Sequence, residues 1–141
     1  MPINSRTKGK TAEREFIGEL KELLGPELTS ELTRNLDQTR DGGHDINGLA
    51  GWAPEIKRYA KLLASDKKKF WEQTITQATA INQKPVLAYR EDRAEWRAVM
   101  RLSDVLGHEH PDWCNDYDYT VEMSLESFCY LVREGANVQA S

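Results

Sequence analysis

The sequence lacks the features that mark secreted, membrane and nucleotide-binding proteins. It has two cysteines in 141 residues, too few for a disulfide framework, so we expect reduced thiols and a cytoplasmic location. No apolar run approaches the roughly eighteen residues of a membrane-spanning helix. The first ten residues hold no apolar segment of a secretion signal. Glycine-rich loops of the kind that bind nucleotide phosphates are also absent.

The composition is that of a folded chain with a single core. Apolar residues make up 39% of the sequence, and four Trp, five Tyr and three Phe exclude a disordered chain. The length corresponds to one domain. We expect residues 1–141 to form that domain, with a flexible basic arm at residues 1–10 and an acidic loop at residues 104–119.

Basic residues are scarce in the second half of the chain. The net charge of −4 disfavours a nucleic-acid partner, yet residues 1–70 carry +2 and residues 71–141 carry −6. No Lys or Arg occurs from Leu102 to Val132. The basic residues of the first half could form a stripe that follows phosphates on an acidic protein. An ordinary solvated surface would have the same composition.

Hydrophobic periodicity predicts an alternation of helices and strands. Gly25-Pro26 ends the first helix, and Gly48 and Gly51 predict an antiparallel hairpin between the two strands that flank them. We expect an α/β or α+β fold, with a mixed central sheet flanked by helices. The expected helices are 12–24, 67–81 and 125–133; the expected strands lie around residue 36 and at 45–49, 53–59, 85–89, 96–102 and 120–123, the pair 85–89 and 96–102 forming a second hairpin.

Glu13 occupies an unusual place on the first predicted helix. It precedes Phe16 and Ile17 by three and four residues, which puts its carboxylate at the apolar edge of the helix. A buried carboxylate needs a cation or strong hydrogen bonds. A glutamate in the first turn, stabilised by the helix dipole, is the alternative interpretation.

Two further carboxylates and a lysine come from neighbouring strands. Glu55 and Lys57 share one face of their strand, and Ile56 points to the other. A solvated ion pair on an amphipathic strand would give the same pattern. The predicted hairpin would bring Asp45 beside Glu55. Two carboxylates at close range are costly unless a divalent metal lies between them, and hard oxygen ligands suit Mg²⁺.

Three segments together are far more specific than any one alone. They read KGKTAERE at 8–15, GGHDI at 42–46 and EIK at 55–57. This combination resembles the PD-(D/E)XK nuclease superfamily, and within it the small Holliday junction resolvases of archaea and phages. The resemblance runs from residue 8 to about residue 102. It has three departures: Pro54 precedes Glu55 in a strand that is usually continuous, the acidic loop 104–119 is outside the core pattern, and the net negative charge is unusual for a protein that binds junctions. It implies a restriction-endonuclease-like fold and a metal-dependent DNA endonuclease that leaves 5′-phosphate and 3′-hydroxyl ends.

The resemblance also implies a set of site residues. Glu13, Asp45, Glu55 and Lys57 would be catalytic, and Mg²⁺, with Mn²⁺ as the alternative, would be held by the three carboxylates and the carbonyl of Ile56. Lys57 would position the attacking water and stabilise charge at phosphorus. Contacts to DNA are expected from a scattered set of residues: Lys8, Lys10, Arg40, Arg58, Lys61 and Gln73.

The expected partner is DNA, in the form of a four-way or branched junction. Because a resolvase nicks two strands symmetrically and one chain supplies one site, we expect a homodimer with two-fold symmetry and no association with membranes. If a phage encodes the chain, it would act in the host cytoplasm. Two alternatives remain open: a nicking or end-processing nuclease of the same superfamily without junction preference, and a non-enzymatic module that binds a partner through the acidic loop 104–119.

Overall fold

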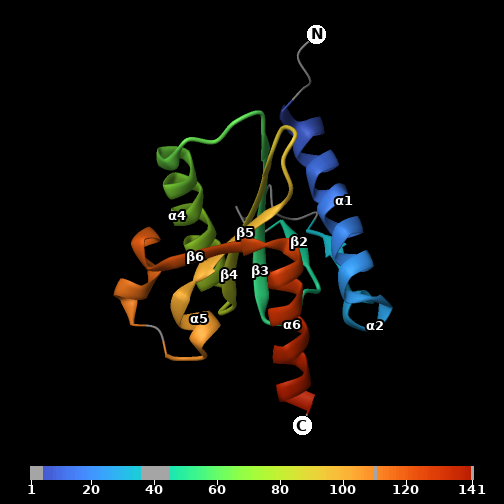
Figure 1. Cartoon of the computed structure of the whole chain (residues 1–141), viewed down its shortest axis with the longest axis vertical. Coiled ribbons are helices and arrows are strands. Elements are labelled where there is room, and N and C mark those ends of the chain that lie inside the picture. The colour runs from blue at the N-terminus through green and yellow to red at the C-terminus, as the bar shows by residue number, and fades with distance from the viewer. Residues whose placement is uncertain (1–4, 36–44, 110, 141) are drawn as a thin grey trace.

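The computed structural model describes residues 5–35, 45–109 and 111–140. Figure 1 shows a central sheet with helices packed around it. In chain order the elements are α1 (Ser5–Leu24), α2 (Pro26–Thr29), β1 (Thr33–Arg34), β2 (Ile46–Asn47), β3 (Trp52–Tyr59), α4 (Ala64–Ala80), β4 (Lys84–Glu91), β5 (Arg97–Arg101), α5 (Leu102–Leu106), the 3₁₀ helices η1 (Asp112–Asn115) and η2 (Tyr117–Tyr119), β6 (Thr120–Ser124) and α6 (Leu125–Ala140).

The main sheet has four strands in the order β3-β4-β5-β6. β3 and β4 are parallel, with α4 as the crossover between them, while β5 and β6 extend the sheet in antiparallel fashion. α1 and α6 cover one face and α4 covers the other (Figure 1). The predicted mixed sheet flanked by helices is therefore confirmed, as is the hairpin that β4 and β5 form.

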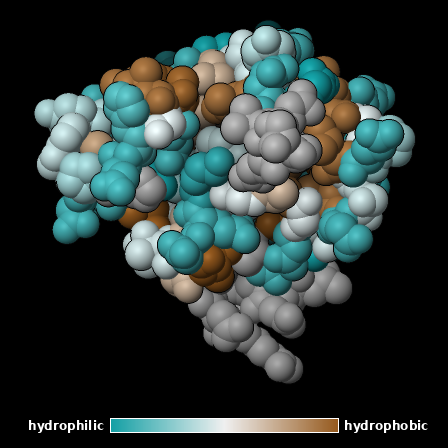
Figure 2. Space-filling model, turned by 90° about the horizontal axis from the view of Figure 1, so that it is seen from below, coloured by the Kyte–Doolittle hydropathy of each residue, from teal (hydrophilic) through white to brown (hydrophobic). Residues whose placement is uncertain are grey.

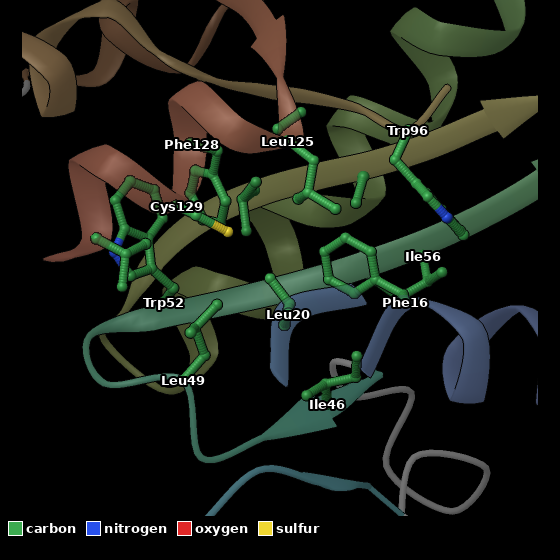
Figure 3. Close-up of a cluster of buried hydrophobic side chains, with 14 of the residues drawn as sticks. Phe16, Leu20, Ile46, Leu49, Trp52, Ile56, Trp96, Leu125, Phe128 and Cys129 are labelled. Carbon is green, nitrogen blue, oxygen red and sulfur yellow. The ribbon is translucent and has the colours of Figure 1, made fainter. Parts of the chain in front are cut away.

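Side-chain alternation along the strands divides the core into two clusters. The larger cluster lies against α1 and α6, where Phe16 and Leu20 pack near Ile56 of β3, and Phe128 meets Trp52 edge to face (Figure 3). The smaller cluster lies under α4, where Trp71 is fully buried against Leu87 and its neighbours. Both faces of the sheet are thus covered by apolar side chains, each of which contributes about 1.5–3 kcal/mol when fully buried.

α1 begins at Ser5, well before the predicted start at residue 12. Residues 5–10 therefore belong to a helix and not to a flexible arm, while residues 1–4 lie outside the described part of the chain. Arg, Lys, Ala and Glu are good helix formers, and a helix nucleated by the buried stripe of Phe16 and Leu20 gains further turns at little cost. Lys8 and Lys10 consequently lie on α1.

The predicted hairpin between residues 45–49 and 53–59 is wrong. β2 instead pairs with β1 in a separate two-stranded sheet. Gly48 serves a different purpose from a hairpin turn: it has φ +93°, and a Cβ there would stand 2.0 Å from the carbonyl oxygen of Glu31. The absence of a side chain at Gly48 therefore allows the residues that follow β2 to pack closely against the backbone of Glu31, just before β1. The strand expected around Leu36 lies outside the described residues.

The acidic segment 104–119 is more ordered than the predicted loop. α5 includes its first three residues, and η1 and η2 span most of the remainder that the structure describes. The indole Nε1 of Trp71 donates a hydrogen bond to the carbonyl of Asn115 at 2.7 Å, which ties the segment to α4. Asp116 accepts a hydrogen bond from the amide of Asp118, a common turn-forming contact.

The end of the molecule where α5 and α6 lie has a mixed surface. Figure 2, which views the molecule from below, shows apolar residues in separate areas among polar ones. A groove of about 410 Å³ at α5 and α6 is lined by Val105, Leu131 and their neighbours.

Among the described helices, none combines the length and the apolar character needed to cross a membrane.

Candidate active site

The open edge of β3 holds Asp45 by its main chain and by its side chain. The Asp45 amide donates a hydrogen bond to the Pro54 carbonyl at 3.0 Å. The Ile56 amide in turn donates to Asp45 Oδ2 at 2.6 Å. β3 is an edge strand and Pro54 faces its open side, so the missing N–H of Pro54 removes no bond to β4. The strand is therefore continuous through the proline.

Glu55 and Lys57 lie on the face of β3 that α4 covers. Glu55 is 3% exposed, and Lys57 Nζ lies 3.1 Å from Glu55 Oε1. The second carboxylate oxygen, Oε2, is buried and has no hydrogen-bond partner in the described part of the protein. Buried carboxylate oxygens are normally satisfied, so this atom marks a place where a cation or a donor is missing.

Burial and mutual repulsion raise the pKa values of two carboxyl groups. The pKa of Asp45 lies well above its usual value, first because the group is buried and second because the charge of Glu55 is close. The Ile56 amide and Lys57 act in the opposite direction and do not compensate fully. Burial likewise raises the pKa of Glu55 against the opposing effect of Lys57. Among the described residues, the site therefore has more buried negative charge than the nearby cations neutralise.

Glu13 approaches the same place from α1. It is 6% exposed, and its Oε2 forms an ion pair with Arg34 Nε at 2.7 Å. Its negative charge contributes to the raised pKa values of Asp45 and Glu55, which places it near both. Since α1 begins at Ser5, Glu13 is not in the first turn, and the alternative of a dipole-stabilised first-turn glutamate is wrong.

Two residues at the site were not found from the sequence. Arg34 of β1 holds Glu13, a contact between residues far apart in the sequence. Gln77 of α4 is buried beside Glu55, and its side-chain amide lowers the pKa of that carboxyl. Helical spacing could have suggested Gln77, since it lies one turn beyond Gln73 on a helix with a buried face.

The other predicted contacts to DNA are spread around the site. Lys10 and Lys61 are exposed, and Arg58 forms an ion pair with Asp92. Gln73 is exposed on α4, in contrast to the buried Gln77. Lys8 is described only through its place in α1, and Arg40 lies outside the described residues.

The donor atoms fit a hard divalent cation bound by few protein ligands. Asp45 and Glu55 supply carboxylates, and the Ile56 carbonyl faces the same side of the strand as the amide that binds Asp45. In the described ranges, no three His, Cys, Asp or Glu side chains form a ready cage. Mg²⁺ suits such a site because it keeps several waters and takes only one or two carboxylates. Glu55 Oε2, which has no hydrogen-bond partner in the described ranges, is the atom that such an ion would satisfy.

Comparison with known families decides the class of this protein. The family described as "Phage putative PDDEXK endonuclease" matches residues 4–133. The chain belongs to this family. The resemblance to PD-(D/E)XK nucleases noted in the sequence is confirmed, and the protein is a PDDEXK-type endonuclease.

Among solved structures, the chain is similar to Hjc of Archaeoglobus fulgidus, a Holliday junction resolvase from an archaeal hyperthermophile. The identity is 21%, the match covers 84% of each chain, and the TM-score is 0.44. This likeness is too distant to bear on substrate. No curated protein matches the chain.

Proposed function

We propose that this PDDEXK endonuclease is a DNA resolvase that depends on a divalent metal, cuts four-way or branched DNA, and leaves 5′-phosphate and 3′-hydroxyl ends. The observation that carries the metal dependence is the buried pair Asp45 and Glu55, with raised pKa values and one oxygen that has no hydrogen-bond partner within the described part of the chain. The preference for junctions is supported by the sequence motifs around Glu13, Asp45 and Glu55.

The proposed roles follow from where each group lies. Asp45, Glu55 and the Ile56 carbonyl would hold the metal, which when bound polarises the scissile phosphate and lowers the pKa of a coordinated water. The Lys57 ammonium group would orient the attacking water and offset the charge that develops on phosphorus. Glu13, fixed by Arg34, would accept a hydrogen bond from that water or complete the set of ligands.

Contact with DNA would use basic side chains on both sides of β3. Lys10 projects from α1, Lys61 follows β3, and Lys68 and Lys69 are exposed near the start of α4. Phosphate contacts of this kind position a duplex without reading its sequence. The acidic segment 104–119 is tied to α4 at Asn115, and its negative charge would keep DNA away from that part of the surface by repulsion. Two symmetric nicks would require a homodimer.

The test is cleavage of a labelled four-way junction, a flap and a linear duplex of matched sequence, each with Mg²⁺, Mn²⁺ or EDTA. We expect paired, symmetric nicks in the junction and no cleavage in EDTA. We also expect the protein to have the mass of a dimer in solution. Cleavage of all three substrates would support the nuclease activity but contradict the proposed preference for junctions. No cleavage of any substrate with either metal would overturn the proposed activity and favour a binding module. Glu126→Gln, at an exposed position on α6, is the control variant and should cleave DNA as the wild type does.

A further inference from the structure

Lys57 has a second partner besides Glu55. Its Nζ lies 4.6 Å from the ring centroid of Phe70, in the first half of α4. The ring is itself held, because Tyr59 stacks on it at a centroid distance of 5.5 Å and an interplanar angle of 19°. Lys57 and Tyr59 are two residues apart on β3 and so meet Phe70 from the same face of the strand. The ammonium group thus sits between a carboxylate and an aromatic ring.

The two partners respond differently to a divalent cation. A cation at Glu55 would share the carboxylate that now attracts Lys57 and would repel the ammonium group directly. The ring is neutral, so its attraction for Lys57 persists whether or not Glu55 is engaged. A lysine side chain has a flexible four-carbon stem, and without a second contact its ammonium group would lose its fixed place.

We propose that Phe70 is a positioning residue, whose ring keeps the Lys57 ammonium group at the reaction centre when Glu55 binds a divalent cation. This inference rests on the proposed function and adds to it a residue that touches neither metal nor DNA. Tyr59 supports the ring in that orientation. The interaction is electrostatic, so it depends on the electron density of the ring and not only on its size.

The first test replaces Phe70 with phenylalanines that carry one, two or five fluorines, which withdraw electron density with little change in shape. We expect kcat to fall stepwise, by about tenfold at five fluorines, with KM for DNA nearly unchanged. Phe70→Leu should lose activity to the same extent, and Phe70→Tyr should recover most of it. Fluorination of Phe128, which packs against Trp52 in the other cluster, is the matched control. An unchanged kcat across the Phe70 series, in an enzyme that cleaves DNA, would overturn the inference and leave the proposed function intact.

The second test needs no cleavage. Protons on Cε of Lys57 lie near the face of an aromatic ring, so their NMR signals should be shifted upfield, and the shift should disappear in Phe70→Leu. We expect the upfield shift to persist when Mg²⁺ is added. Loss of the upfield shift on addition of Mg²⁺ would overturn the inference about Phe70, whether or not the protein cleaves DNA. Failure to cleave any of the DNA substrates would overturn the proposed function and is a separate result.

Discussion

Two buried ion pairs in this protein use their carboxylates in opposite ways. Arg101 holds Asp104 through two contacts, at 2.8 and 3.3 Å, and also donates to Asn115 at 3.0 Å. Lys57 contacts one oxygen of Glu55, and the other has no hydrogen-bond partner among the residues that the structure describes. The first pair is satisfied within the chain, whereas the second, with Asp45 beside it, is the pair at which we propose a metal cation.

The difference separates a carboxylate that is satisfied within the chain from one that we propose is functional. Both carboxyl groups are almost fully buried, with side chains 4% exposed in each case. Burial alone therefore does not mark the active site. The informative feature is burial without full compensation, which folding tolerates only where other interactions stabilise the chain and where a ligand can make use of the open oxygen.

Changes in the uncompensated pair should have the largest effect on activity. We expect Asp45→Asn and Lys57→Ala each to lower kcat at least about a thousandfold, because one removes a metal ligand and the other removes the charge opposite the phosphate. Binding of the junction in Ca²⁺, measured by gel shift, should survive in both. Cleavage retained by either purified variant would disprove the site assignment.

Changes in the satisfied pair should instead affect stability. Arg101→Met removes the cation that pairs with the buried Asp104 carboxylate, and we expect a loss of about 3–5 kcal/mol in the free energy of unfolding. The matched control is Arg97→Met, which breaks the more exposed pair with Glu122 and should cost about 1 kcal/mol or less. Urea unfolding measures both. Equal losses in the two variants would remove the distinction between a buried and an exposed pair.

Gln77 and Gln73 of α4 allow a second comparison, between a buried glutamine beside Glu55 and an exposed one. Gln77→Ala removes an amide that lowers the pKa of Glu55, and we expect kcat to fall about three- to tenfold with little change in stability. Gln73→Ala, at the exposed position that the sequence suggested as a DNA contact, should stay within about twofold. Steady-state kinetics on the junction would compare the two variants. A larger loss of kcat in Gln73→Ala than in Gln77→Ala would restore the prediction that Gln73 contacts DNA.

The smallest expected effect is on the stability of the metal-free protein. Because the folded chain raises the pKa of Asp45 above 3.8, it binds this proton more tightly than the unfolded chain does, and stability falls as pH rises through the raised pKa. Asp45→Asn should therefore melt above the wild type at neutral pH in EDTA. The advantage should vanish in acid below pH 3.8, where the carboxyl is protonated in both states.

Mg²⁺ supplies the internal control for that measurement. At ten times its Kd it should stabilise the wild type by about 1.4 kcal/mol, and Asp45→Asn by less. Thermal melts at several pH values with and without Mg²⁺ give all of these quantities. A variant less stable than the wild type at neutral pH would show that the Asp45 charge is compensated after all.

Local patterns in the sequence were sufficient for much of the fold and part of the site. Alternation along a strand placed Glu55 and Lys57 on one face, and Gly25 ended α1 where predicted. The crossover helix was predicted at 67–81, close to its actual bounds, and Asp66 lies in its first turn. Its carboxylate accepts a hydrogen bond from the amide of Leu63, the residue that caps the helix.

Contacts between distant segments were decided only by the tertiary structure. Period and turn residues show which side chains share a face, but not which strand lies beside which, since many pairings satisfy the same pattern. β2 therefore pairs with β1 against expectation, and Asp45 still reaches β3 through the Ile56 amide. The pairing of Arg34 with Glu13 and the burial of Gln77 depend on how α1 and α4 pack against the edge of β3. The sequence shows which groups could do the chemistry, whereas packing determines which of their charges remain uncompensated among the described residues.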